Sequence, residues 1–399
     1  MKILVADKFP EARLADLKAL GAAVEYQPDV AVKDLAAAAS NAVVLVVRSK
    51  KVQADVFENA PALSLVVRAG AGVNTIDVAA ASRRGVFVAN CPGQNAIAVA
   101  ELAIGLLLAL DRRVPDNVQA LREGRWDKKT FSEADGLFGR AIGVAGLGAI
   151  GLETARRAAG LGMRVHAWSR SLDDEKARAL GVERAPDLET LASRVDALSL
   201  HLPLKPETRG VVSRAVLEKL RPGAILVNTA RAEIVDQQAL LELAQAGRIR
   251  VGADVHAGEP EGGRGEFHSE LATLPNFYGT HHIGASTEQA QDAIARETVR
   301  IVETFMRGGA VPNCVNVARK TPARAKLVVR HHDKRGVLAN VFDSIRRAGI
   351  NVQTIENTVF EQATAACCNI ELDERPSPAL LEEIRSRRDE VIFVDSFDL

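Results

Sequence analysis

A glycine-rich turn that joins an apolar strand to a helix constrains this chain more than any other feature. Residues 141–151 read Ala-Ile-Gly-Val-Ala-Gly-Leu-Gly-Ala-Ile-Gly, so an apolar segment leads directly into the pattern Gly146-x-Gly148-x-x-Gly151. An alanine-rich helical segment follows, and then a second strand at residues 164–168. In this order of strand, turn, helix and strand, the glycine pattern is typical of a dinucleotide site. The sequence therefore predicts a Rossmann-type nucleotide domain.

The three glycines have separate physical roles. Gly146 permits the tight turn, Gly148 lets the backbone approach a pyrophosphate, and Gly151 lets the helix and the strand pack closely. The N–H groups at the start of the helix, around Ala149 and Ile150, would bind the anion. A close-packed turn without any ligand would explain Gly151 but not all three glycines.

The order of strands and helices predicts an α/β fold with three domains. Short apolar strands alternate with alanine-rich helices from residue 1 to residue 89, and the alternation resumes after residue 139. Such alternation is typical of doubly wound parallel sheets. We therefore predict a substrate-binding domain at residues 1–96 and 290–318, with a dinucleotide-binding domain at residues 97–289 inserted in it. The periodicity breaks at residues 319–324, and residues 323–399 follow the βαββαβ order of a small ferredoxin-like module.

Composition and charge narrow the classes of partner. The 399 residues contain 51 acidic and 51 basic side chains, so no net field would attract nucleic acid or a charged membrane. The four cysteines lack the spacing of a metal site or of a disulfide framework. The chain starts with a short strand and not with a signal peptide, and its most apolar helical segment, residues 96–110, is too short to cross a bilayer. We expect a cytoplasmic protein without a metal that binds small molecules and forms a homodimer or homotetramer.

Three polar residues downstream of the turn favour hydroxy-acid chemistry. Arg231 lies in Asn-Thr-Ala-Arg-Ala, Glu259 in Ala-Gly-Glu-Pro and His282 in His-His-Ile-Gly. A guanidinium can bind a carboxylate through two hydrogen bonds, and a histidine paired with a carboxylate is the usual proton shuttle near neutral pH. Each residue alone has an ordinary structural explanation. Together, behind a nucleotide fold, the three indicate oxidation of a hydroxy acid.

The end of the second strand favours NADP over NAD. An acid at this position would hold the adenosine ribose, but the sequence reads Trp-Ser-Arg-Ser, which places Ser169 and Arg170 there. Without the acid, no carboxylate repels the 2′-phosphate of NADP, and Arg170 supplies a cation that can bind it. The alternative is that Arg170 is solvated and that Asp173 or Asp174 takes the place of the acid.

Several segments of the chain resemble the D-2-hydroxyacid dehydrogenase family, and within it the D-3-phosphoglycerate dehydrogenases. They are the glycine turn and residues 67–77, 90–96, 100–102, 228–231, 254–260 and 281–287, so the resemblance covers nearly the whole chain. It implies that Arg231 binds the substrate, that Glu259 is the partner of the histidine, and that His282 is the acid and base. Asp254 matches the position that contacts the nicotinamide carboxamide. The loop whose N–H groups hold the substrate carboxylate matches Ala69, Gly70, Ala71, Gly72 and Val73.

The same resemblance implies basic side chains near a substrate phosphate. Arg48 and Ser49 match a segment that lies near this phosphate, and Lys128 or Lys129 lies in a passage similar to one after the long helix. Charge complementarity favours the role for Arg48, and a solvated side chain is the ordinary alternative. Ala232 stands where the family usually has glycine, a departure that costs little unless the backbone needs a positive φ.

The C-terminal module resembles an ACT domain, a module that senses amino acids. His331, Asp333 and Asn351 match positions that contact the effector in serine-sensing relatives. Asp333 stands where asparagine is usual and Arg335 where proline is usual, and both departures count against serine. The sequence thus leaves two interpretations open, an L-serine site and a module that only pairs subunits through its sheet edges.

The resemblance implies reversible, NAD(P)-dependent oxidation of D-3-phosphoglycerate to 3-phosphohydroxypyruvate in L-serine biosynthesis. An NADP-dependent glyoxylate or hydroxypyruvate reductase is the alternative enzyme, which Ser169 and Arg170 would suit and the ACT-like module would not. The alternative of another class is a dinucleotide-sensing, corepressor-like binding protein, because one fold can serve both purposes.

Overall fold

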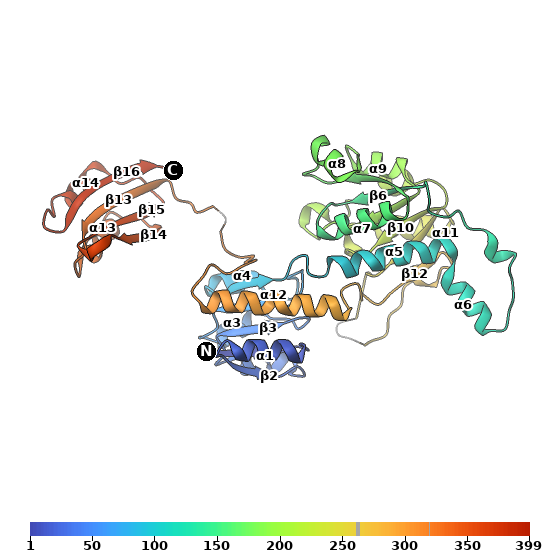
Figure 1. Ribbon diagram of the computed structural model, residues 1–399, viewed down its shortest axis with the longest axis horizontal. Coiled ribbons are helices and arrows are strands. Elements are labelled where there is room, and N and C mark those ends of the chain that lie inside the picture. Colours follow the sequence, from blue (N-terminus) through green and yellow to red (C-terminus); the bar gives the residue numbers. More distant parts are fainter. Residues whose placement is uncertain (261–263, 319) are drawn as a thin grey trace. The chain divides into compact units, whose positions relative to one another are not determined.

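The computed structural model describes residues 1–260, 264–318 and 320–399 (Figure 1). Contacts between residues divide the chain into two compact units, Met1–Asn316 and Val317–Leu399. Both units combine helices with sheets, and the predicted α/β fold class is confirmed. Arg319, in the predicted linker, lies outside the described residues.

The first sheet of the larger unit has five parallel strands in the order β2-β1-β3-β4-β5. The strands are β1 (Lys2–Val5), β2 (Ala23–Tyr26), β3 (Val44–Val47), β4 (Leu65–Arg68) and β5 (Phe87–Asn90), and the helices are α1 (Glu11–Ala19), α2 (Leu35–Ala39), α3 (Ala54–Asn59) and α4 (Val78–Arg83). β3 is apolar and fully buried, as expected of a strand covered on both faces. The sequence analysis missed β2, because this edge strand is only partly buried and reads Ala-Val-Glu-Tyr.

The second sheet has seven parallel strands in the order β12-β11-β10-β9-β6-β7-β8. The strands are β6 (Ala141–Ala145), β7 (Arg164–Trp168), β8 (Glu183–Arg184), β9 (Ala197–Leu200), β10 (Ala224–Asn228), β11 (Ile249–Ala253) and β12 (Phe277–Gly279). The helices are α6 (Val114–Arg122), α7 (Ala149–Gly160), α8 (Asp174–Leu180), α9 (Leu188–Arg194), α10 (Arg214–Glu218) and α11 (Gln237–Gln245). The strand order reverses between β6 and β9, and ligands of such sheets bind at the carboxyl ends of the strands at this point.

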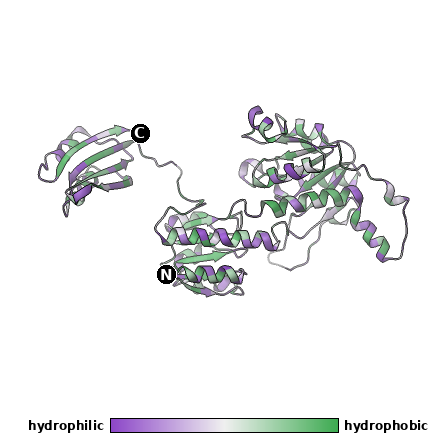
Figure 2. Ribbon diagram, in the orientation of Figure 1, coloured by the Kyte–Doolittle hydropathy of each residue, from purple (hydrophilic) through white to green (hydrophobic). Residues whose placement is uncertain are grey.

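Two long helices connect the two sheets. α5 (Ala96–Arg112) leads from the first sheet into the second, and it is hydrophobic along most of its length (Figure 2). α12 (Glu288–Met306) returns, and its Ile294, Ile301 and Val302 belong to a core cluster of the first sheet. An ion pair of 2.8 Å joins Arg13 of α1 to Asp292 of α12. The chain therefore returns to its first sheet after building the second, and the exact domain boundaries stay a prediction.

The smaller unit is a four-stranded antiparallel sheet with two helices. The strand order is β14-β15-β13-β16. Along the chain the elements are β13 (Ala325–His332), α13 (Val337–Arg347), β14 (Val352–Val359), β15 (Ala365–Leu372), α14 (Pro378–Arg385) and β16 (Val391–Asp398), which is a βαββαβ order. Every second residue of β15 is buried, and three of these residues share one core with apolar residues of both helices. The identification of this unit as an ACT domain stays a prediction.

The part of the chain that the structure describes has neither a membrane-spanning helix nor a metal-binding cluster. No helix there is both long and apolar enough to span a membrane. No group of His, Cys, Asp and Glu side chains there is arranged to hold a metal ion.

Candidate active site

The glycine turn lies where β6 ends and α7 begins. Gly146 has a φ of 97°, and a Cβ at this position would lie 2.6 Å from the backbone oxygen of His201. A Cβ on Gly151 would lie 1.9 Å from the oxygen of Gly146. In contrast, no atom lies within 4 Å of the ideal Cβ position of Gly148. Packing therefore explains two of the glycines, and Gly148 leaves an open backbone surface for a ligand.

The helix that follows the turn is open to an anion. Gly148 is the N-cap residue of α7, and no side chain caps the first turn. The N–H groups of this turn, including those of Ala149 and Ile150, have no partners within the helix itself. The uncapped helix and the open surface at Gly148 together fit the pyrophosphate of a dinucleotide.

His282 and Glu259 form a direct pair. Nδ1 of His282 lies 2.7 Å from Oε2 of Glu259, and both side chains are partly exposed. The other carboxylate oxygen, Oε1, accepts the backbone N–H of His256 at 2.7 Å. Burial alone would raise the pKa of the Glu259 carboxyl, but the hydrogen bonds from His282 and from the His256 N–H hold this pKa below its usual value. An ionised Glu259 thus orients the imidazole through Nδ1 and leaves Nε2 for a substrate.

Asp254, at the end of β11, holds the loop that carries His282. Its carboxylate is 1 % exposed and accepts hydrogen bonds from Thr280 Oγ1 at 2.6 Å and from the N–H groups of Ile283 and Gly284, both at 2.8 Å. His282 has a φ of 52°, in the left-handed region that residues other than glycine seldom adopt. Asp254 therefore stabilises an unfavourable backbone conformation at His282. Its contact with a nicotinamide carboxamide stays a prediction.

Arg231 reaches the loop that follows β4. Its Nη2 lies 3.3 Å from the ideal Cβ position of Gly72, and its Nη1 donates to the oxygen of Ala230 at 2.6 Å. Asn228, the last residue of β10, fixes the turn by donating to the oxygen of Arg231 at 2.9 Å. Ala232 does not have a positive φ, so alanine in place of glycine causes no backbone strain there.

The loop from Ala69 to Val73 presents free backbone donors beside this guanidinium. The N–H of Gly70 donates to the oxygen of Arg68. Within the described residues, the N–H groups of Ala71, Gly72 and Val73 have no acceptor. Adjacent free N–H groups next to a guanidinium suit a carboxylate ligand.

A third arginine, Arg68, shares this site with Arg231 and Arg48, and the sequence analysis did not single it out. Burial lowers the pKa of the Arg68 guanidinium, and the positive charges of Arg231 and Arg48 lower it further. Its Nε is buried without a hydrogen-bond partner. The carboxylate of Asp7 compensates these charges in part, and a group of three cations beside one carboxylate suits an anionic ligand. The sequence did contain a signal for Arg68, because it is a basic residue at the carboxyl end of the buried strand β4, where ligands of such sheets bind.

Arg48 and Ser49 lie in a turn that Asp7 holds. Oδ2 of Asp7 accepts the N–H groups of Arg48, Ser49 and Lys50 at 2.7, 3.0 and 3.1 Å, and its Oδ1 lies 3.2 Å from the Ser49 hydroxyl. The serine hydroxyl is therefore engaged within the protein, whereas the Arg48 guanidinium is bound by no described side chain. Lys128 and Lys129 are exposed, and no described contact joins them to these residues.

Ser169 and Arg170 form a turn directly after β7, in which the N–H of Leu172 donates to the oxygen of Ser169 at 3.1 Å. Arg170 is exposed, and no ion pair with it occurs among the described residues. Asp173 caps α8 and pairs with Lys176 at 3.0 Å, and Asp174 pairs with Arg184 at 3.3 Å. Both aspartates are thus engaged around α8, and Arg170 is the charge left free at the end of the strand.

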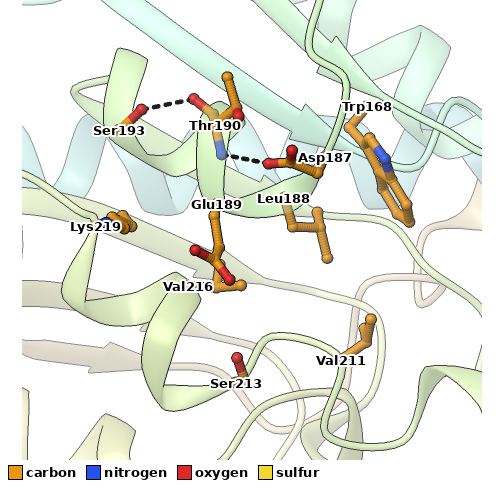
Figure 3. Close-up of a pocket in the computed structure, with 10 residues that line it drawn as sticks. All are labelled: Trp168, Asp187, Leu188, Glu189, Thr190, Ser193, Val211, Ser213, Val216 and Lys219. Carbon is orange, nitrogen blue, oxygen red and sulfur yellow. Dashed lines mark hydrogen bonds between the residues drawn. The ribbon is translucent and has the colours of Figure 1, made fainter.

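A pocket of about 690 Å³ is lined in part by Trp168, the residue before this turn (Figure 3). Trp168, the last residue of β7, forms one wall, and residues of α9 and of the region around α10 form the others (Figure 3). The lining residues are Trp168, Asp187, Leu188, Glu189, Thr190, Ser193, Val211, Ser213, Val216 and Lys219. The apolar side chains of this lining suit contact with a planar base, and Asp187, Glu189 and Lys219 make much of the rest of it polar. The sequence analysis missed the pocket because its residues come from separate segments.

The three residues predicted to bind an effector lie in the smaller unit. His331 is buried, and its Nε2 lies 3.3 Å from Oδ1 of Asn357. The N–H of Asn351 donates to Oδ1 of Asp373 at 2.9 Å. No described hydrogen bond or ion pair joins His331, Asp333 and Asn351 to one another. Their role as an effector site stays a prediction.

The larger unit thus combines a dinucleotide turn, a histidine paired with a carboxylate, and a guanidinium beside free N–H groups, which suits hydride and proton transfer on a hydroxy acid. The family model for the D-isomer specific 2-hydroxyacid dehydrogenase, NAD binding domain, matches residues 104–284. A hydroxypyruvate reductase from Thermotoga maritima is 41 % identical over 258 residues, 64 % of this chain and 82 % of the relative. The chain belongs to the D-isomer specific 2-hydroxyacid dehydrogenase family. The matched domain is the one that binds the nicotinamide dinucleotide in this family.

Members of the family that are similar to this chain differ in substrate. A D-3-phosphoglycerate dehydrogenase from Methanocaldococcus jannaschii is 39 % identical over 319 residues, 79 % of this chain. The chain spans 60 % of the length of that relative. A solved structure of an NADPH-dependent glyoxylate/hydroxypyruvate reductase from Sinorhizobium meliloti, in complex with NADP and malonate, is 28 % identical, with a TM-score of 0.68 and coverage of 80 % of this chain and 99 % of that chain.

Proposed function

We propose that the protein is an NAD(P)-dependent dehydrogenase that oxidises D-3-phosphoglycerate reversibly to 3-phosphohydroxypyruvate. The observation that carries this proposal is the buried guanidinium of Arg68, on which the charges of Arg231 and Arg48 both act, beside the loop whose Gly72 faces Arg231. A substrate with both a carboxylate and a phosphate supplies the negative charge that these cations require. The similarity to D-3-phosphoglycerate dehydrogenases over most of the chain supports the same substrate.

In the proposed mechanism, the residues of the chain bind the substrate and move its proton. The nicotinamide, when bound, exchanges a hydride with C2 of the hydroxy acid. Nε2 of His282 takes the hydroxyl proton during oxidation and returns it during reduction. Glu259 holds the imidazole through Nδ1 and stabilises the imidazolium, while Arg231 binds the carboxylate and polarises the carbonyl oxygen.

We infer that NADP is preferred to NAD. The free charge of Arg170 at the end of β7 favours a 2′-phosphate, and the pocket beside Trp168 would receive the adenine. Measured kcat/KM with each cofactor tests this inference. Ser169→Asp together with Arg170→Leu should shift the preference toward NAD by about tenfold or more, the effect of losing a charge-assisted contact. A strong preference of the unaltered protein for NAD would contradict it.

Initial rates with D-3-phosphoglycerate, hydroxypyruvate and glyoxylate test the proposed substrate. Arg48→Gln should raise KM for the phosphorylated substrate about tenfold or more and change KM for hydroxypyruvate little. Arg307→Gln, at an exposed arginine at the end of α12, is the matched control. Equal effects of Arg48→Gln on both substrates would refute its contact with the phosphate.

Reduction of hydroxypyruvate or glyoxylate is the second candidate function. It is favoured by the similarity to the Thermotoga maritima reductase, of which the chain covers 82 %. Preference for the unphosphorylated keto acids would establish this function instead. A binding protein of the corepressor type would hold the dinucleotide without turnover, and His282→Asn would leave its function intact.

Assembly as a homodimer or homotetramer, a cytoplasmic location and the sensing of L-serine by His331, Asp333 and Asn351 remain part of this proposal. Initial rates at millimolar L-serine test the last of these. An unchanged rate would favour a module that only pairs subunits.

A further inference from the structure

We propose that His256 is a positioning residue for the pair of Glu259 and His282, an inference that rests on the function proposed above. His256 lies in the turn after β11, three residues before Glu259, and is partly buried. It acts on the reaction through the two residues of the pair and not by touching the substrate.

His256 is linked to both members of the pair. Its backbone N–H donates to Oε1 of Glu259 at 2.7 Å, and Nε2 of its imidazole lies 2.8 Å from the oxygen of Thr280. A carbonyl oxygen can only accept a hydrogen bond, so this Nε2 carries a proton and donates it. Thr280 stands two residues before His282. One residue therefore joins the turn that carries Glu259 to the loop that carries His282, whose side chains meet at 2.7 Å.

Aromatic packing restricts the imidazole of His256. The ring centroids of Phe267 and Phe277 lie 5.2 and 6.0 Å from that of His256. The backbone of β12 is also close, because a Cβ on Gly279 would lie 3.2 Å from Cε1 of His256. A ring in such surroundings has few alternative rotamers, so its hydrogen bond to Thr280 constrains the position of the loop.

The constraint matters because the loop is strained at His282, which has a φ of 52°. Asp254 holds the N–H groups of Ile283 and Gly284 after the histidine, and it also accepts the Thr280 hydroxyl before it. His256 holds the carbonyl oxygen of Thr280. Without the Nε2 donor, this carbonyl loses its partner, and the backbone before His282 can relax so that the imidazole moves away from Glu259.

Two substitutions separate the donor from the aromatic ring. His256→Phe keeps a ring against Phe267 and Phe277 and removes the donor, whereas His256→Gln supplies an amide N–H near the position of Nε2. His268→Phe is the matched control, because His268 is exposed and its side chain has no hydrogen bond among the described residues. All variants are made in the full chain.

For His256→Phe we expect kcat to fall about three- to thirtyfold, the size of a lost hydrogen bond, with KM within about twofold of the original value. The pH profile of kcat/KM should also change, because Glu259 no longer holds the His282 imidazole in a fixed geometry. His256→Gln should restore most of the activity and the original pH profile, and His268→Phe should behave as the unaltered protein.

An NMR titration of the His282 imidazole, which needs no turnover, separates this inference from the proposed function. If the unaltered protein is active but His256→Phe leaves kcat, the pH profile and the titration unchanged, the positioning role is wrong. A variant that only melts at a lower temperature, with unchanged kcat and titration, shows a structural role and also overturns it. If no hydroxy acid is turned over at all, the proposed function fails, and the titration alone decides whether His256 positions the pair.

Discussion

The structural reason for glycine at position 148 differs from the reasons at Gly146 and Gly151. Gly146 needs a positive φ, and both Gly146 and Gly151 face backbone atoms closer than a Cβ tolerates. Gly148 has neither constraint, since its φ is −75° and the space beside it is open. A ligand that approaches the backbone supplies the missing reason, because a methyl group there would stand in its way.

Alanine at Gly148 should therefore weaken dinucleotide binding, whereas alanine at Gly151 should destabilise the fold. Gly148→Ala should leave the free energy of unfolding within about 1 kcal/mol and weaken dinucleotide binding about tenfold or more. Gly151→Ala should destabilise the fold by about 1–3 kcal/mol, because its Cβ would lie 1.9 Å from a backbone oxygen. Urea unfolding and dinucleotide titration measure both quantities. Unchanged dinucleotide affinity in Gly148→Ala would remove the turn from the binding site.

At the scale of elements, β9 ends opposite the glycine turn, and the residue that follows it is an unusual histidine. Burial lowers the pKa of the His201 imidazole to about 3. Part of the residue reaches the surface, but its Nδ1 is enclosed without a partner, and Nε2 lies 2.8 Å from the Ser199 hydroxyl. Because the ring nitrogens are shielded from water, burial disfavours the charged imidazolium and lowers the pKa of His201. The folded protein thus keeps His201 neutral at pH values where the unfolded chain protonates it.

This difference predicts an acid-sensitive stability. The contribution of the neutral His201 to the free energy of unfolding is fully present above the unfolded pKa of 6.5. It is lost as the pH falls toward the folded pKa of about 3. Between pH 7 and pH 5, the unaltered protein should lose about 1–2 kcal/mol more of its free energy of unfolding than His201→Gln does. Urea unfolding at both pH values measures this. Parallel losses in the two proteins would show that His201 is not neutral by burial.

Another connection between elements ties the end of α5 to the segment before β6. Asp111 of α5 is 1 % exposed, accepts the N–H of Gly136 at 3.2 Å and pairs with Arg140 at 3.4 Å. Arg140 also pairs with Asp135 at 3.3 Å, but Asp135 is exposed. The buried carboxylate therefore anchors the chain as it enters the second sheet.

Removal of this carboxylate should cost far more than removal of its exposed neighbour. Asp111→Ala removes the acceptor of the half-buried Gly136 N–H and the buried partner of Arg140, and it should lower the free energy of unfolding by about 1–3 kcal/mol. Asp135→Ala removes only an exposed ion pair and should cost less than about 1 kcal/mol. Denaturant unfolding compares the two variants, and equal losses would contradict an anchoring role for Asp111.

At the scale of the whole molecule, the larger unit contains both parallel sheets and every residue proposed for the reaction. Its last residues belong to this fold, because Oδ1 of Asn316 accepts the N–H of Val88 at 2.8 Å and the N–H of Val315 donates to the oxygen of Val88. The smaller unit has a core of its own. Each unit thus has the hydrophobic core that independent folding requires.

A chain that ends at Asn316 should therefore fold and bind the dinucleotide with a Kd within about twofold of the full-length value. A chain that ends at Gly308 loses the contacts of Val315 and Asn316 with β5 and should unfold at a lower temperature. Thermal unfolding and dinucleotide titration test both truncations. A truncation at Asn316 that is unfolded would show that the larger unit depends on the smaller one.

The sequence alone determined the features that depend on local patterns. The glycine spacing predicted the turn after β6, the hydrophobic alternation predicted the parallel sheets, and the βαββαβ order predicted the smaller unit, because each is a rule about neighbours along the chain. Arg231, Glu259 and His282 were selected by residue type and local motif, and their catalytic roles remain proposals.

Only the tertiary structure decided which side chains share a site. The charges of Arg48 and Arg231 act on Arg68, Asp7 holds the turn at Arg48, and His256 contacts the loop before His282, although these partners stand in separate segments of the sequence. Asp254, whose contact with a cofactor stays a prediction, also holds the loop that carries His282. Such contacts follow from how the ends of parallel strands converge at one edge of a sheet, and this convergence leaves no periodic signal in the sequence.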